Sequence, residues 1–166
     1  MEKTENICTL IDDAAYLCDE LAALKMVAES VPVMERPEGQ DSLFDKIAKI
    51  FWMQEQLFLP FFYSYSEKVP PSDCMNYAAK GNKQTSYRDV MELYPDIHVL
   101  TTACIEKRKE LLSILKTIDS SSWKQMCIYD GEENKAGEVL AEMVTLERKI
   151  LKEAAERVMI FERSSS

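Results

Sequence analysis

Apolar side chains recur every three or four residues along four long stretches of this chain, as in helices with one buried face. These four stretches are residues 5–29, 42–62, 96–118 and 135–162. Pro32 follows the first stretch and is incompatible with its continuation. Ser42, with Asp45 three residues later, is a typical helix-start signal for the second. The pattern therefore predicts four long amphipathic helices.

The connections between these helices differ in length. Residues 63–85 contain many polar residues with Pro and Gly and are predicted to form a long loop, followed by a short helical piece over 87–94. Residues 119–123 predict a short helical turn, and residues 130–134 a tight turn. No stretch alternates like a β-strand over a convincing length. The sequence thus predicts an all-α protein: a four-helix bundle with a long connection between helices 2 and 3 and a short extra helix before the last helix.

Composition narrows the class of protein. The chain has 166 residues, of which 46% are hydrophobic and 30% charged, which fits one globular domain over residues 1–166. A formal net charge of -9 disfavours binding to nucleic acid or to an anionic membrane. No apolar run approaches the ~20 residues that span a bilayer, and the first residues are polar. A cytoplasmic protein is therefore expected.

The cysteines indicate neither a disulfide framework nor a zinc site. There are five, they are widely scattered, and no two form a CxxC pair. Cys8, Cys18 and Cys104 fall on predicted helices and are expected to be small core residues. Cys74, in the long polar loop, is the best candidate for a reactive thiol.

Several short motifs occur in an order that is similar to one family. The second helix follows a proline-bearing turn and opens on Ser-Leu; the third ends before an acidic turn that contains Trp; the last opens on Gly-Glu-Val-Leu-Ala. Residues 36–43 form the turn and the start of the second helix, and residues 48–54, Ala-Lys-Ile-Phe-Trp-Met-Gln, its middle. Residues 110–115 and 119–123 are the end of the third helix and the acidic turn, and residues 137–141 open the last helix. Over roughly residues 5–160, this arrangement resembles the DinB-like four-helix bundles.

The resemblance implies that the metal site of the family is missing. Where it is present, that site takes one histidine from the second helix and two, four residues apart, from the last. The matching positions here are Lys49, Leu146 and Ile150. Leu and Ile offer no lone pair, and a protonated Lys repels a cation, so no metal and no other cofactor are expected. His98, the only histidine, is on the third helix and is expected to be structural or exposed.

The same positions define a candidate ligand pocket made of Lys49, Gln54, Glu142, Leu146 and Ile150. Lys49 could bind an anionic ligand or pair with Glu142 or Glu147; the alternative is a surface lysine whose stem lies along the helices. The acids near these positions could equally form a solvated helix face.

Three functions remain open from the sequence. The first is a metal-free small-molecule-binding or regulatory protein that forms a homodimer. The second is a thiol-transferase-like or hydrolase-like enzyme with a non-standard pocket near Lys49. The third is a protein-interaction module that uses the aromatic end of the second helix. The serines at 120–122 lack the partners of a catalytic triad, and no glycine-rich phosphate loop is present.

Overall fold

The computed structural model describes residues 2–36, 39–67, 89–90, 92–129 and 131–164. Most of these residues are helical, which confirms the predicted predominance of helix. The helices are α1 (Glu2–Val27), η1 (Ala28–Ser30), α2 (Leu43–Met53), η3 (Gln54–Phe58), α3 (Leu59–Ser66), α6 (Ile97–Leu115), α7 (Ser120–Trp123) and α8 (Ala136–Ser164). Two short strands, β1 (Met126–Tyr129) and β2 (Glu132–Lys135), pair antiparallel between α7 and α8. No helix within the described ranges combines the length and apolar character needed to cross a bilayer.

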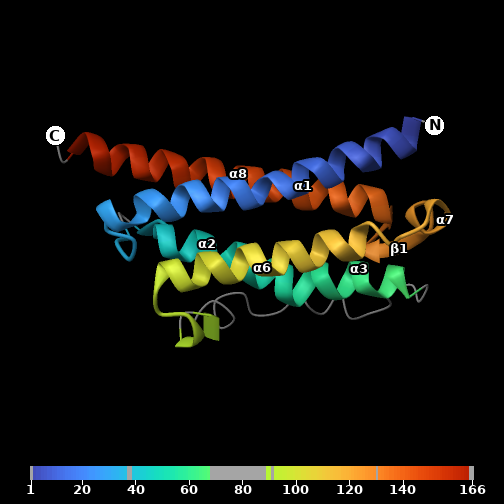
Figure 1. Ribbon diagram of the computed structural model, residues 1–166, viewed down its shortest axis with the longest axis horizontal. Coiled ribbons are helices and arrows are strands. Elements are labelled where there is room, and N and C mark those ends of the chain that lie inside the picture. The colour runs from blue at the N-terminus through green and yellow to red at the C-terminus, as the bar shows by residue number, and fades with distance from the viewer. Residues whose placement is uncertain (1, 37–38, 68–88, 91, 130, 165–166) are drawn as a thin grey trace.

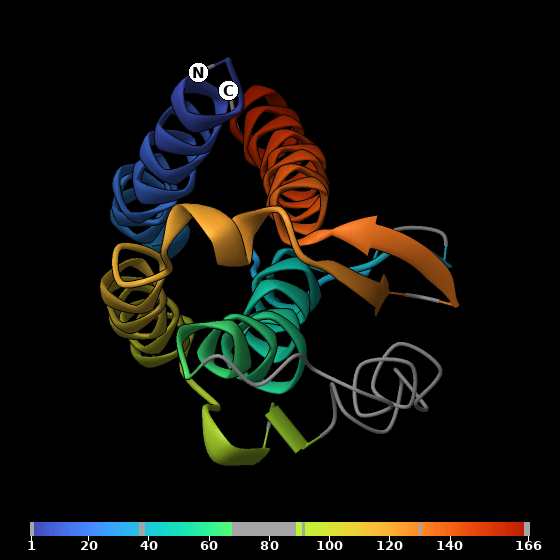
Figure 2. The ribbon, with the colours of Figure 1, turned by 90° about the vertical axis from the view of Figure 1, so that its right-hand side faces the viewer.

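The long helices lie side by side along the longest axis of the molecule (Figure 1). Helix α1 packs against α6 and α8, and α2 packs against the same two helices. Seen end-on in Figure 2, the helices surround a shared interior, and α7 with the two strands lies across one end. The interior is filled by apolar side chains from all of these helices and is rich in aromatic rings, including those of Phe44, Phe51, Phe58, Phe61, Phe62 and Tyr65.

Side-chain caps fix where several helices begin. At α2 the predicted signal is confirmed: the Ser42 hydroxyl accepts from the Asp45 amide at 3.0 Å, and the Asp45 carboxylate accepts from the Ser42 amide at 2.9 Å. The Asp96 carboxylate accepts from the His98 amide at the start of α6, and Asp119 caps α7 in the same way. These caps satisfy amides that a helix start otherwise leaves without a partner.

The second long helix contains a π-helical turn. Over Gln54–Phe58 the backbone widens, and the Leu59 amide donates to the carbonyl of Gln54, five residues earlier. Pro60 follows directly; it has no amide to donate, and its ring would clash with the carbonyl of Gln56 in a regular α-helix. The wide turn lets the chain pass this proline and continue to Ser66. The predicted loop from residue 63 was therefore wrong for residues 63–66, and its remainder from 68 to 85 lies outside the described residues, as does Cys74.

Two further expectations were wrong. The chain contains a hairpin, although no strand was expected; Gly131, with φ +81°, lies in its turn, and Tyr129 stacks on Phe58 in the interior. Cys8 is exposed, whereas Cys104 is buried as expected and Cys18 is half-buried. The N-terminal part of α1 therefore presents a thiol to solvent.

Candidate functional site

The five predicted pocket residues do not come together around one space. Gln54 and Ile150 are buried, Leu146 packs half-buried against the core, Lys49 is half-buried and Glu142 is exposed. None of the five lines the cavities described below. Within the described ranges, no three His, Cys, Asp or Glu side chains are close enough to share a metal ion.

Two of the polar residues near those positions instead join a buried cluster around Arg108. This arginine of α6 is fully buried; its Nε donates to Gln54 Oε1 at 2.8 Å, its Nη1 to the carbonyl of Ala14 at 3.1 Å, and its Nη2 to the carboxylate of Glu147. Glu147, considered above as a partner for Lys49, is thus an ion-pair partner of Arg108. Burial raises the pKa of Glu147, and the charge and hydrogen bond of Arg108 oppose that rise.

The cluster connects all the long helices at one level, because Ala14, Gln54, Arg108 and Glu147 come from α1, η3, α6 and α8. Each guanidinium nitrogen has a protein acceptor, one of them the buried carboxylate of Glu147, so the charge of Arg108 is balanced within the core. The arrangement is that of a structural ion pair rather than a binding site. The sequence did contain its signal: Arg108 occupies a position of the apolar stripe of α6, four residues after Cys104 and three before Leu111.

An apolar cavity of about 540 Å³ opens at the end of the molecule that Figure 2 faces. It lies where the start of α1, the end of α6, helix α7 and the start of α8 meet. We call it the apolar cavity; its lining residues are Asn6, Ile7, Cys8, Ile11, Leu115, Lys116, Ile118, Ser120, Trp123, Lys124, Lys135, Gly137, Glu138 and Ala141. Its size is within the range of cavities that hold small organic ligands.

The rim of the apolar cavity is mainly cationic. Lys116 and Lys124 are exposed and Lys135 is half-buried. The single carboxylate of the lining, Glu138, is engaged at the start of α8, where it accepts from the Lys135 amide at 3.1 Å. At the wall, a Cβ on Gly137 would lie 2.8 Å from Cδ1 of Ile7, so a larger residue here would require the end of the Ile7 side chain to move. An apolar interior with a basic rim suits a ligand that has an apolar body and an anionic head.

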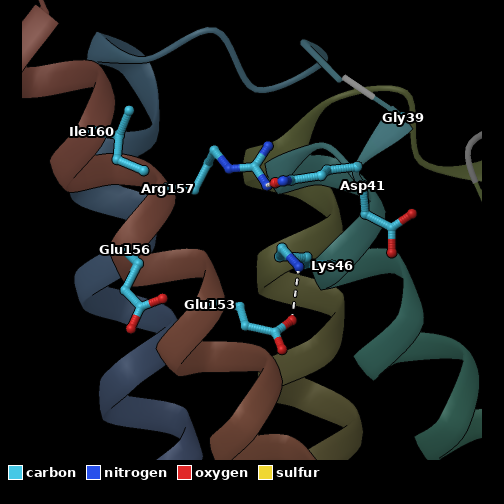
Figure 3. Close-up of a pocket in the computed structure, with 8 residues that line it drawn as sticks. Gly39, Asp41, Lys46, Glu153, Glu156, Arg157 and Ile160 are labelled. Atoms are coloured by element: carbon cyan, nitrogen blue, oxygen red, sulfur yellow. Dashed lines mark hydrogen bonds and ion pairs between the residues drawn. The ribbon is translucent and has the colours of Figure 1, made fainter. Parts of the chain in front are cut away.

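A second cavity, of about 450 Å³, lies at the opposite end, where α2 begins and α8 approaches its end (Figure 3). We call it the polar cavity; its lining residues are Gly39, Gln40, Asp41, Lys46, Glu153, Glu156, Arg157 and Ile160. Lys46 Nζ donates to Glu153 Oε2 at 2.9 Å, and Arg157 Nη2 donates to Gln40 Oε1 at 2.7 Å. The hydrogen bond from Lys46 is the main reason that the pKa of Glu153 lies below its usual value.

Sequence reasoning did not identify either cavity as the site. The polar cavity is also lined by residues of the second and last helices, among them Lys46, Glu153 and Arg157, but not by Lys49, Leu146 or Ile150, the positions that the family resemblance implied. Comparisons of the chain with models of known protein families, with curated protein sequences and with solved structures gave no significant match. The function of the chain is therefore inferred from its cavities.

Proposed function

We propose that this chain is a metal-free small-molecule-binding protein whose ligand occupies the apolar cavity. The observation that carries this proposal is the cavity of about 540 Å³ with an apolar interior and Lys116, Lys124 and Lys135 at its rim. Burial of an apolar ligand body in such a space is favourable in proportion to the area removed from water. The lysines would attract an anionic head group such as a carboxylate. The ligand class is therefore an apolar carboxylic acid of small size.

Matched straight-chain ligands test this proposal. Decanoate and decanol share an apolar chain and differ in the charge of the head group. We expect isothermal titration calorimetry to detect decanoate binding, and decanol binding several-fold more weakly, since each exposed lysine contributes at most about 1 kcal/mol to an ion pair. Trp123 lines the cavity, so its fluorescence in a Trp52→Phe variant gives a second readout of the same event.

Substitutions locate the binding. Ala141→Phe places a ring in the cavity and should abolish decanoate binding. Ala155→Phe, the same change at an exposed position of α8 outside the cavity, is the matched control and should bind like the wild type. Lys116→Met with Lys124→Met should weaken decanoate binding but leave decanol binding unchanged, whereas Lys152→Met at an exposed position should change neither. Equal binding by the wild type and Ala141→Phe would refute the proposal.

Reactivity of Cys8 gives a measurement that needs no substitution. This thiol is exposed and lines the apolar cavity. A ligand seated there should slow alkylation of Cys8 by iodoacetamide, which peptide mass spectrometry can follow separately from the other cysteines. Unchanged alkylation of Cys8 at saturating decanoate would mean that decanoate binds elsewhere.

The family and assembly state belong to the same proposal. We propose that the long helices form a DinB-like four-helix bundle that lacks the three metal-binding histidines, and that the protein is a cytoplasmic homodimer. The order of the helices, and the packing of α1 and α2 each against both α6 and α8, support the bundle. Light scattering over a range of concentrations tests the dimer, and a monomer throughout would contradict it.

A further inference from the structure

Arg157 is a buried arginine whose hydrogen bonds are incomplete. The residue is only 7% exposed, and its Nη1 is buried without a hydrogen-bond partner. Nη2 has one protein acceptor, the neutral amide oxygen of Gln40. Within the described ranges, no carboxylate forms an ion pair with Arg157. A guanidinium keeps its charge at all physiological pH values, and a buried charge without a counter-charge is unfavourable. The folded chain thus holds a cation that a bound anion would satisfy.

Lys46 brings a second buried cation to the same cavity. Its side chain is 10% exposed and reaches Glu153 from the first turns of α2. An ammonium has three donors, and the carboxylate of Glu153 takes one of them. Figure 3 shows Lys46 and Arg157 entering the cavity from α2 and α8, with the Lys46–Glu153 contact below the guanidinium. Two cationic side chains from different helices therefore border one space.

The acidic residues of the lining do not neutralise Arg157. The carboxylates of Asp41 and Glu156 are on exposed residues, and in Figure 3 they point away from the Arg157 guanidinium. Glu153 is directed toward Lys46. Gln40, which contacts Arg157, is itself exposed and precedes α2, so its amide can turn to water when a stronger acceptor arrives. An oxyanion is such an acceptor, because a hydrogen bond that guanidinium donates to a charged oxygen is stronger than one that it donates to a neutral amide oxygen.

We propose that the polar cavity is a binding site for a small oxyanion, a carboxylate or phosphate group of a small molecule. Two of its oxygens would take the Nη1 and Nη2 donors of Arg157 in place of Gln40, in the paired geometry that guanidinium favours, and Lys46 would supply a further donor. This site lies at the other end of the helices from the apolar cavity and shares no lining residue with it. Evidence against ligand binding in the apolar cavity would therefore not count against this oxyanion site.

The experiment titrates the wild-type protein with inorganic phosphate and, separately, with succinate, at constant ionic strength set by sodium chloride. Calorimetry gives the affinity, and NMR of the nitrogen-15-labelled arginine side chains reports the site directly. We expect one of the two anions to bind at millimolar or lower concentration and to shift the Arg157 side-chain signals. The preferred anion decides between a phosphate and a carboxylate ligand. Absence of any shift at Arg157 with both anions would overturn the proposal.

Substitution separates this site from general attraction of anions. Arg157→Met removes the guanidinium and should reduce affinity at least tenfold. Arg148→Met is the matched control: Arg148 is on the same helix, is largely exposed and pairs with Asp13 at 3.0 Å, so anion binding should be unchanged. Lys46→Met should give an intermediate loss and provides a second test if Arg157→Met does not fold. Equal anion affinity in folded Arg157→Met or Lys46→Met and in the wild type would refute the site.

Discussion

The two deeply buried arginines, Arg108 and Arg157, differ in how their donors are satisfied, and that difference separates structure from binding. Arg108 has an acceptor for each guanidinium nitrogen, including the carboxylate of Glu147. In Arg157, Nη2 has one neutral acceptor, the amide oxygen of Gln40, and the buried Nη1 has no acceptor. A buried charge that is fully paired is costly to disturb, whereas one that is incompletely paired favours any anion that reaches it. We therefore infer that Arg108 stabilises the core and that Arg157 binds a ligand.

Removal of one partner should make the role of Arg108 measurable. Arg108→Met leaves Glu147 buried without its counter-charge, and we expect it to lower the free energy of unfolding by about 3–5 kcal/mol. Urea unfolding followed by circular dichroism measures this. In the double variant Arg108→Met with Glu147→Leu, about 2 kcal/mol or more should be recovered because no unpaired charge remains. A loss below about 1 kcal/mol in the single variant would show that the pair contributes little.

Asp45 gives the chain a defined response to acid. Burial by itself raises the pKa of Asp45, but hydrogen bonds from Arg36 and Ser42, together with the charge of Arg36, outweigh it and hold the pKa below its ordinary value. A carboxyl with a lower pKa in the folded state stabilises the fold above its unfolded pKa, and that stability is lost as the pH falls through the folded pKa. The affected range begins near the ordinary value of about 3.9 and extends below it.

The expected result is a pH-dependent cost of Asp45→Asn. At neutral pH the variant should lose about 1–2 kcal/mol of unfolding free energy, because the cap and the ion pair with Arg36 are both weakened. As the pH falls below the ordinary carboxyl value of about 3.9, the difference from the wild type should shrink, because protonation makes the wild-type carboxyl neutral, like the amide of the variant. Asp12→Asn, at an exposed position of α1, is the control and should differ little at either pH. A cost that stays constant with pH would contradict the assignment.

At the scale of the elements, the π-helical turn and Pro60 act together. Deletion of Gln56, an exposed residue within the turn, should convert Gln54–Phe58 to regular α-helix and place the ring of Pro60 against a backbone carbonyl. We expect a loss of about 3 kcal/mol, the usual cost of proline inside a helix. The same deletion combined with Pro60→Ala should cost clearly less. Equal losses in both variants, measured by urea unfolding, would show that the turn has another cause.

The helices could be predicted from sequence because their stripes and caps are local signals. The α2 start at Ser42 and Asp45 is an example. The hairpin could not, since β2 consists of the polar residues Glu132–Lys135 and β1 is only four residues long. Its stability comes from strand pairing and from Tyr129 packing on Phe58 and Phe61, and these contacts exist only in the folded chain.

The polar cavity shows a different limit of sequence reasoning. The resemblance pointed to Leu146 and Ile150, whereas the polar cavity uses Glu153 and Arg157, each seven residues further along α8. Seven residues are close to two helical turns, so both pairs fall on nearly the same face of the helix. The resemblance did not identify the level along α8 at which a cavity lies. The level depends on how far α2 and α8 overlap, which is a property of the packed molecule.

At the scale of the whole molecule, the two cavities occupy opposite ends of the same set of helices (Figure 1). The apolar cavity borders the start of α8, and the polar cavity borders its last turns. Between them lies the Arg108 cluster, which ties α1, η3, α6 and α8 together at a middle level. A buried centre in which every guanidinium nitrogen has an acceptor transmits little change in packing unless the helices have a second arrangement. The two sites are expected to act independently.

Independence has a measurable consequence. We expect decanoate and the preferred oxyanion each to raise the midpoint of thermal unfolding, and their contributions to the free energy of unfolding to add. The affinity for decanoate, measured by calorimetry with and without a saturating oxyanion, should agree within about twofold, since sites far apart without shared partners are additive to a few tenths of a kcal/mol. By linkage, the oxyanion affinity should be equally insensitive to decanoate. A larger mutual change would mean that the helices shift together on binding. Repeating the measurement with Arg108→Met, if that variant folds, would then test whether the central cluster carries the coupling.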